Sequence, residues 1–188
     1  MNKIHNWYCR SAAWKRRVDT ELMPWALAGV TLSGPGLEIG PGPGITTDYI
    51  RTKVDSLTAL EADPILAERL RRRFQNTSVN VVKGDATAIP FENGAFRTVF
   101  CFTMLHHVPS FALQNKLFAE VRRILAPGGV FVGTDSRLSL RMKVFHWFDT
   151  MVIVDPLVFP KRLLKAGFTD PQIELGQGAF RFRAAREL

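Results

Sequence analysis

The sequence predicts a doubly wound α/β fold, built as a single domain from residues 1–188. Five short apolar runs lack polar alternation, which is typical of parallel strands buried on both faces of a sheet. Between these runs, apolar residues recur at helical spacing. Because 46% of the 188 residues are hydrophobic and no repeat or long linker divides them, the chain can bury one sizeable core.

The predicted elements alternate along the chain. An amphipathic helix is expected first, at 6–26, from the spacing of Trp7, Trp14, Val18, Leu22 and Trp25. Strands are then predicted at 37–39, 56–60, 79–82, 98–102 and 130–134. Helices are predicted at 64–74, at 110–125 behind an N-cap at Ser110, and at 156–166 before Gly167. Two last strands, 172–175 and 179–184, are joined by a glycine-containing turn.

The first predicted strand ends in an acid and a glycine-rich turn, with the sequence LEIGPGPG at 37–44. Glycine at these positions permits sharp turns and lets a ligand approach the backbone. A dinucleotide fingerprint requires a third glycine where Ile45 stands, and the chain has no Gly-Lys-Ser or Gly-Lys-Thr of a phosphate-binding loop. The turn therefore favours a different cofactor.

The second predicted strand also ends in an acid, in the sequence LTALEADP at 57–64. Glu61 lies 21 positions after Gly40, a spacing that suits one βαβ unit and an acid that accepts hydrogen bonds from ribose hydroxyls. Asp63 is expected to cap the following helix and Pro64 to occupy its first position.

Two more motifs follow in order. The third is Gly84-Asp85-Ala86 after a predicted strand, followed by apolar residues at 89–91. The fourth is the strand at 96–102 with TMLHHV at 103–108 and then LAPGG at 125–129. Together the four motifs resemble the class I S-adenosylmethionine-dependent methyltransferases of the small-molecule, type 11-like group, over most of residues 30–135. One departure is Arg97, where the family usually carries Asp.

The resemblance implies a seven-stranded methyltransferase sheet of order 3-2-1-4-5-7-6, with the last strand antiparallel and helices on both faces. It implies S-adenosylmethionine as cofactor, S-adenosylhomocysteine as product and no metal. Glu61 would bind the ribose, Asp85 the adenine amino group, the Ala86 backbone a ring nitrogen, and Glu38 the amino group of the methionine moiety. The full set of expected cofactor-binding residues is Glu38, Gly40, Pro41, Gly42, Gly44, Glu61, Ala62, Asp85, Ala86 and Thr103.

The acceptor is expected to be a small hydrophobic molecule, methylated at O, N or C by in-line displacement. Residues 1–30 would cover the cofactor, and aromatic residues in 137–160 would form a wall of the acceptor pocket. His107 is the preferred catalytic candidate if a proton must be removed, with His106, His146 and Asp135 as further candidates.

Other functions stay open. The chain could be a non-catalytic domain that binds the cofactor or a partner, or it could methylate RNA. The formal net charge of +8 is spread over clusters in several predicted helices, which favours solvated helix faces over a nucleic-acid partner. A third alternative is a lipid or quinone substrate, reached when the basic N-terminal helix rests on a membrane.

A cytoplasmic location is expected. Cys9 and Cys101 do not suggest a disulfide framework, and no segment has the ~18 consecutive apolar residues of a membrane span. The oligomeric state is not predicted from the sequence.

Overall fold

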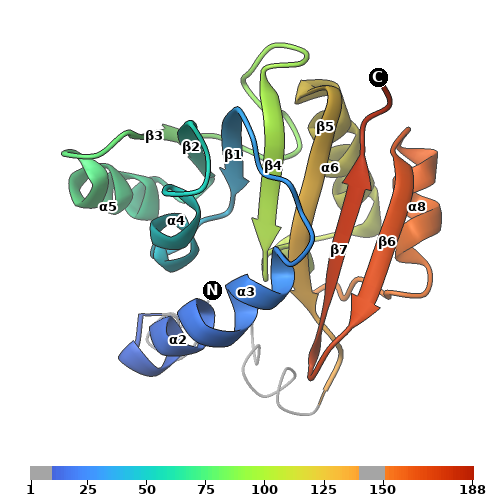
Figure 1. Ribbon diagram of the computed structural model, residues 1–188, viewed down its shortest axis with the longest axis horizontal. Helices are drawn as coiled ribbons and strands as arrows, with labels where there is room; N and C mark the ends of the chain where they lie inside the picture. Colours follow the sequence, from blue (N-terminus) through green and yellow to red (C-terminus); the bar gives the residue numbers. More distant parts are fainter. Residues whose placement is uncertain (1–9, 140–150) are drawn as a thin grey trace.

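The computed structural model describes residues 10–139 and 151–188, which form one seven-stranded sheet (Figure 1). The strand order is β3-β2-β1-β4-β5-β7-β6, so the predicted order is confirmed. The strands are β1 (Pro35–Ile39), β2 (Ser56–Glu61), β3 (Val79–Lys83), β4 (Phe96–Phe102), β5 (Leu125–Ser136), β6 (Thr169–Leu175) and β7 (Ala179–Ala185). The first five strands pair in parallel, and β7 runs antiparallel to both β5 and β6.

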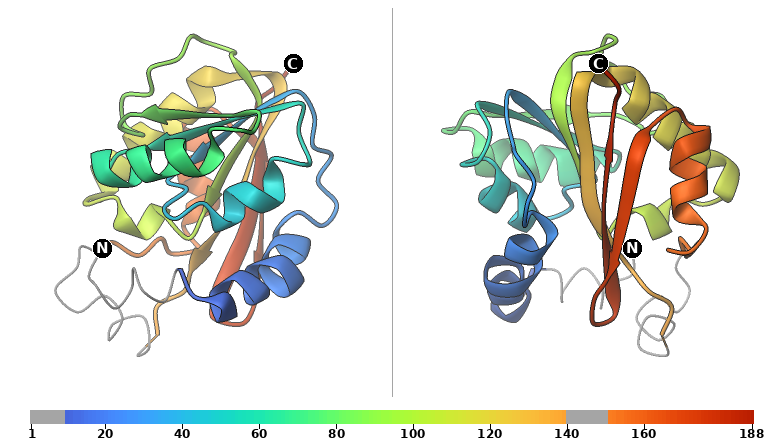
Figure 2. Two further views of the ribbon diagram at one scale, coloured as in Figure 1. Left: turned by 90° about the vertical axis from the view of Figure 1, so that its left-hand side faces the viewer. Right: turned by 45° about the vertical axis from the view of Figure 1, so that its right-hand side comes forward.

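Helices cover both faces of the sheet (Figures 1 and 2). They are α2 (Ala12–Arg17), α3 (Met23–Ala26), α4 (Ile45–Ile50), α5 (Pro64–Phe74), α6 (Phe111–Ile124) and α8 (Phe159–Lys165). A π-helical turn η1 (Val18–Leu22) joins α2 to α3, and a 3-10 turn η2 (Leu105–His107) follows β4. Among the described residues, no helix has both the length and the apolar character needed to cross a bilayer.

Alternating side chains of the central strands separate two hydrophobic cores. Val99 and Cys101 of β4 point into a core with α6 and α8, whereas Phe100 and Phe102 point into a core with α3, α4 and α5. Successive strand residues face opposite sides of a sheet, so an uninterrupted apolar run is what a doubly covered strand requires.

Helices α5 and α6 begin where the sequence places their caps. The Asp63 carboxylate accepts hydrogen bonds from the backbone N–H groups of Ile65 and Leu66, at 2.7 and 3.0 Å. The Ser110 hydroxyl accepts from the N–H of Leu113 at 3.2 Å. These caps fix the first turns of both helices next to the ends of β2 and β4.

Helix α8 begins later than predicted. The sequence places its start at 156, but the helix begins at Phe159, because residues 156–158 form a turn in which the Leu157 N–H donates to the Asp155 carboxylate at 2.9 Å. Helix α4 and the turn η2 were not predicted, since both are short and lack a complete helical apolar pattern.

The predicted N-terminal helix is not a regular α-helix. In η1 the N–H of Met23 donates to the carbonyl of Val18, five residues back, and this extra residue shifts the helical phase. Val18, Met23 and Ala26 are therefore buried, whereas Leu22 and Trp25 are only partly buried. The Trp25 indole N–H donates to Glu174 at 2.8 Å, which anchors α3 to the β6–β7 hairpin.

Candidate functional site

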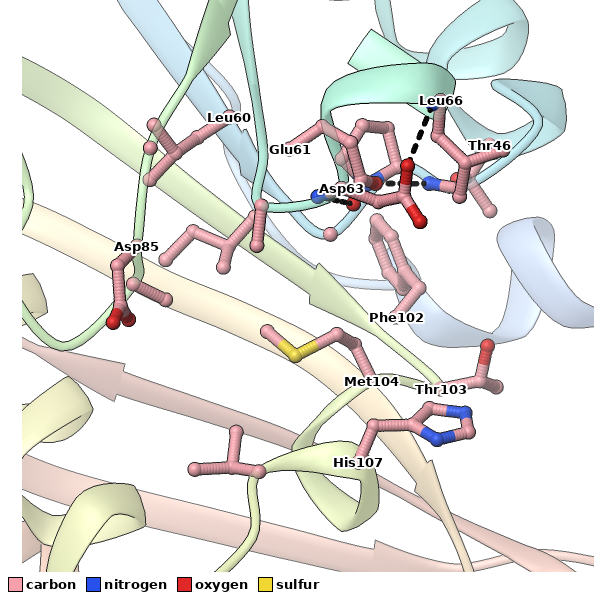
Figure 3. A pocket seen from close by; sticks show the side chains of 18 of the residues that line it. Thr46, Leu60, Glu61, Asp63, Leu66, Asp85, Phe102, Thr103, Met104 and His107 are labelled. Carbon is pink, nitrogen blue, oxygen red and sulfur yellow. Dashed lines mark hydrogen bonds between the residues drawn. The ribbon is translucent and has the colours of Figure 1, made fainter. Parts of the chain in front are cut away.

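A cavity of about 550 Å³ lies at the carboxyl ends of the parallel strands (Figure 3). Its walls come from the segments that follow β1, β2, β3 and β4, together with α2 and the start of α6. The strand order reverses between β1 and β4, and ligands of open α/β sheets bind at such a switch point. The volume falls in the range of small-molecule sites.

The glycine-rich turn forms one wall of this cavity. Gly40 has a φ of +66°, and a Cβ there would lie 2.3 Å from Cγ of Met104, so the position requires glycine on both grounds. Gly42 has a φ of +55°, and a Cβ added there would meet no atom within 4 Å. The turn therefore presents bare backbone to open space at Gly42, as a ligand cradle does.

Glu61 stands at the end of β2 and is 7% exposed. Its two carboxylate oxygens accept hydrogen bonds from the backbone N–H groups of Gly42, at 3.1 Å, and Asp63, at 3.0 Å. Burial raises the pKa of this carboxyl, and the two N–H donors partly offset the rise by favouring the charged form. The contacts fix an acceptor group at the cavity wall.

Asp85 lies across the cavity from Glu61, after β3 (Figure 3). One of its oxygens accepts from the N–H of Thr87 at 2.7 Å, and the side chain is exposed. Leu60 and Ala86 also line this part of the cavity. An apolar surface beside a carboxylate can accommodate a flat heterocycle that carries an amino group.

Two expected cofactor residues do not line the cavity. Glu38 is buried behind the wall, where its carboxylate accepts hydrogen bonds from the hydroxyls of Thr46 and Thr47, each at 2.5 Å. Burial raises its pKa from 4.5 to about 7. The expected contact of Glu38 with the methionine amino group stays a prediction, and Thr46, which hydrogen-bonds to Glu38, does line the cavity.

Gly44 is the second residue that does not line the cavity, and its expected role in cofactor binding stays a prediction. It caps α4 with a φ of +81°, and a Cβ there would lie 2.7 Å from a methyl carbon of Leu70 and 2.8 Å from the ring of Phe74. Glycine is needed at position 44 because α4 packs against α5 there. The other eight predicted residues line one cavity; they are Gly40, Pro41, Gly42, Glu61, Ala62, Asp85, Ala86 and Thr103.

The catalytic candidates separate into two groups. His107 lines the cavity, whereas His106 is 2% exposed and its Nδ1 lies 2.5 Å from a carboxylate oxygen of the buried Asp135. The centroids of the two imidazole rings are 4.2 Å apart. His106 and Asp135 therefore belong to the wall behind His107. His146 lies outside the described residues.

The roles of 1–30 and 137–160 as walls of the site stay predictions, and the structure places the described residues of both segments. Trp14 of α2 lines the cavity, but Trp7 lies outside the described residues. In the second segment, Leu138 is exposed and Phe159 is fully buried among core phenylalanines, so Phe159 is not a pocket residue. Residues 140–150 lie outside the described part of the chain. Met104 and Leu113 line the cavity without a sequence signal of their own.

Residues 37–133 match a protein family described as a methyltransferase domain. The chain belongs to this family. The match spans all four motifs and more than half of the chain, and it places the protein among the class I S-adenosylmethionine-dependent methyltransferases.

Two relatives extend the comparison. The chain is 36% identical over 130 residues to an ornithine lipid N-methyltransferase of Singulisphaera acidiphila, covering 64% of this chain and 65% of the relative. It is 31% identical over 147 residues to ribosomal RNA small subunit methyltransferase A of Bordetella pertussis, covering 69% of this chain and 54% of the relative. The chain thus matches between half and two thirds of the length of these relatives.

A solved structure has the same fold. Phosphoethanolamine N-methyltransferase 2 of Haemonchus contortus, in complex with S-adenosylmethionine, superposes with a TM-score of 0.74 at 15% identity. The match covers 93% of this chain and 53% of that one.

The family implies S-adenosylmethionine as the cofactor, and the cavity of this chain fits it in three respects. The volume of about 550 Å³ is adequate, the backbone at Gly42 is open to a ligand, and Glu61 and Asp85 place carboxylates at two separate points of the wall. A nucleoside with a charged amino acid tail matches these polar points.

Proposed function

We propose that this protein transfers a methyl group from S-adenosylmethionine to a polar atom of a small lipophilic acceptor. The observation that supports this most is that polar and apolar residues line the same cavity. The glycine turn, Glu61 and Asp85 provide polar groups that suit the cofactor. Trp14, Val108 and Leu113 contribute apolar surface that suits an acceptor with hydrocarbon groups.

The chain would act mainly by holding the reactants. Bound S-adenosylmethionine supplies an electrophilic methyl group on a sulfonium sulfur. The Glu61 carboxylate is already oriented by Gly42 and Asp63. It would accept hydrogen bonds from the ribose hydroxyls, and Asp85 would accept one from the adenine amino group. Such orientation can provide effective molarities of roughly 10⁵ to 10⁸ M.

His107 is the proposed proton acceptor. It lines the cavity together with Thr103 and Met104, which follow β4. A hydroxyl or ammonium acceptor must lose a proton for methylation, and a neutral imidazole within hydrogen-bond reach can take it. His106 and Asp135 lie behind His107, where their hydrogen bond supports the position of the η2 turn.

The relatives support two acceptor classes. One relative is named for an ornithine lipid and the other for ribosomal RNA. The apolar residues that line the cavity favour the lipid class for this protein, and we make RNA the competing outcome of the test.

The test uses the full chain with S-adenosylmethionine that carries a tritiated methyl group. A bacterial lipid extract dispersed in detergent and a total RNA preparation are offered separately. We expect label in the lipid fraction, and its loss in the variant Glu61→Ala. The control variant Glu68→Ala, exposed on α5, should keep the activity. Label in RNA alone would contradict the proposed acceptor class, and label in neither fraction would favour a non-catalytic binding domain.

A further inference from the structure

Large apolar side chains exposed to solvent gather at the edge of the sheet that carries the cavity. Among the described residues, eight such side chains are exposed. Two of them, Leu164 and Leu188, lie elsewhere. The other six belong to segments at the carboxyl ends of the parallel strands, and we call them the apolar edge: Ile65, Phe111, Leu138, Leu157, Val158 and Leu175.

Ile65 and Phe111 lie beside the cavity. Ile65 is 63% exposed in the first turn of α5, between Asp63 and Leu66, both of which line the cavity. Phe111 is 59% exposed at the start of α6, next to the lining residues Pro109 and Leu113. The cavity is therefore bordered by exposed apolar side chains from two helices.

The other four members, Leu138, Leu157, Val158 and Leu175, lie at the same edge, and hydrogen bonds fix the segments that carry them. The N–H of Val152 donates to the carbonyl of His106 at 2.8 Å, which fixes the segment before α8 next to η2. Arg162 near the start of α8 donates to Asn115 near the start of α6, at 2.8 Å, while Arg122 near the end of α6 donates to the carbonyl of Gly167 just after α8. The two helices thus run in the same direction.

Because α6 and α8 are parallel, Leu157 and Val158 lie at the level of Phe111. Leu175 ends β6, whose hairpin turn is joined to the segment after β5 by a hydrogen bond from the Arg137 N–H to the Gly178 carbonyl, at 2.9 Å. Leu138 follows directly. Figure 1 shows the ends of β4 and β6 on the same side of the molecule as α2 and α3.

Basic side chains accompany this edge. Helix α2 carries Lys15, Arg16 and Arg17 on exposed positions, while Trp14 of the same helix lines the cavity. The neighbouring Asp19 and Glu21 form ion pairs with Lys15 and Arg17, so α2 and η1 together are modestly positive. The exposed acids Asp63 and Asp155 lie beside Ile65 and Leu157. The chain as a whole has a formal net charge of +8. Cations next to exposed apolar side chains match an anionic lipid surface.

We propose that the apolar edge and α2 dock on an anionic membrane surface, with the mouth of the cavity turned toward the lipid. Shallow insertion of Ile65, Phe111 and Leu157 would bury side chains that are otherwise in water, and Arg16 would contact lipid phosphates. The acceptor would then enter from the interface without crossing water. The role of docking in acceptor supply rests on the proposed function, whereas docking itself does not.

The experiment is a co-sedimentation of the full chain with sucrose-loaded vesicles, without cofactor or acceptor. One vesicle is phosphatidylcholine alone and the other contains roughly one third phosphatidylglycerol, a fraction sufficient to give a negative surface potential. We expect the partition coefficient to be at least about tenfold higher on the anionic vesicle and to fall with added salt.

Matched variants locate the contact. The pair Ile65→Ser and Leu157→Ser, combined in one protein, should lower binding about tenfold. The control pair Leu164→Ser and Leu188→Ser removes exposed apolar surface away from the edge and should leave binding unchanged. Arg16→Glu should also weaken binding, whereas Lys165→Glu, exposed at the far end of α8, should not. Circular dichroism verifies that each variant folds.

Three results would overturn the proposal. They are absence of binding to anionic vesicles, an equal loss in the edge and control pairs, or a dimer in sedimentation velocity that only the edge pair dissociates. In the last case a second copy of the chain covers the edge. Because binding is measured without cofactor, each of these results leaves the methyl-transfer assay in detergent to judge the proposed function separately.

Discussion

At the scale of single residues, the assignment of S-adenosylmethionine as cofactor depends on Glu61 and Asp85. Each carboxylate lines the cavity, and the backbone donors of Gly42 and Asp63 orient Glu61. Loss of a charged hydrogen-bond partner costs roughly 1 to 3 kcal/mol. We therefore expect Glu61→Ala and Asp85→Ala each to weaken S-adenosylmethionine binding by about 5-fold to 150-fold in calorimetric titrations.

The matched control for these two variants is Glu68→Ala, which removes an exposed carboxylate from α5 without touching the cavity. Its affinity should equal that of the unmodified chain. If Glu61→Ala and Asp85→Ala also bind with unchanged affinity, the assignment of both residues is wrong.

The raised pKa of Glu38 predicts that the free energy of unfolding depends on pH. Its pKa is raised from 4.5 to about 7, chiefly by burial. Because the folded state holds this proton more tightly than the unfolded chain does, its contribution to stability is complete below pH 4.5 and is lost as the pH rises through 7. Relative to Glu38→Gln, which cannot ionise, the unmodified chain should lose on the order of 3 kcal/mol of unfolding free energy between about pH 4 and 8.

Urea titrations of both proteins across this pH range measure the difference directly. Taking the difference cancels contributions from other titrating groups, among them Glu61, whose pKa is also raised. A difference that stays constant with pH would show that Glu38 titrates normally.

The variant His107→Ala tests proton removal from the acceptor separately from cofactor binding. General acid–base catalysis typically contributes about 10² to 10⁴ in rate, so His107→Ala should lower kcat at least about 100-fold for an acceptor that loses a proton. The affinity for S-adenosylmethionine should change little, because the polar points assigned to the cofactor lie elsewhere. An unchanged kcat with the same acceptor would remove His107 from the mechanism.

At the scale of elements, the glycine turn combines two functions that the sequence does not distinguish. Gly42 faces open space, whereas Gly44 fits against α5. Gly44→Ala would force a Cβ against Leu70 and Phe74 in a left-handed conformation, so we expect a loss of roughly 2 to 4 kcal/mol in unfolding free energy.

Gly178→Ala is the matched control for this packing effect. Gly178 has a φ of +74° and no atom within 4 Å of an added Cβ, so only the conformational cost of about 1 to 2 kcal/mol should appear. Equal losses in the two variants would mean that the contact of Gly44 with α5 does not matter.

The elements also show where sequence patterns succeed. Helix α5 has the predicted bounds, because Asp63 and Pro64 are strong start signals and Leu66, Leu70 and Phe74 keep one helical phase. The N-terminal helix departs from its pattern, because the π turn at Val18–Leu22 moves the buried face by one residue. The π turn packs against α4, a tertiary contact that a helical pattern alone does not encode.

At the scale of the whole molecule, the sheet order and the gathering of eight motif residues around one cavity could be predicted because the motifs fall at strand ends. Parallel strands bring their carboxyl ends to one edge, so Gly40, Glu61 and Asp85 converge although they are distant in sequence. The burial of Glu38 could not be predicted, since it depends on hydroxyls of α4, a helix without a sequence signal. The apolar edge likewise appears only when five separate segments are assembled.

A calorimetric titration of the full chain with S-adenosylmethionine, with NAD as the control ligand, tests whether the cavity binds the proposed cofactor. Every site assignment depends on the cavity at the end of β1 and β4 accepting this cofactor. We predict micromolar binding of S-adenosylmethionine with one site per chain, and no binding of NAD. A folded sample that binds NAD, or that binds neither ligand, would contradict the account.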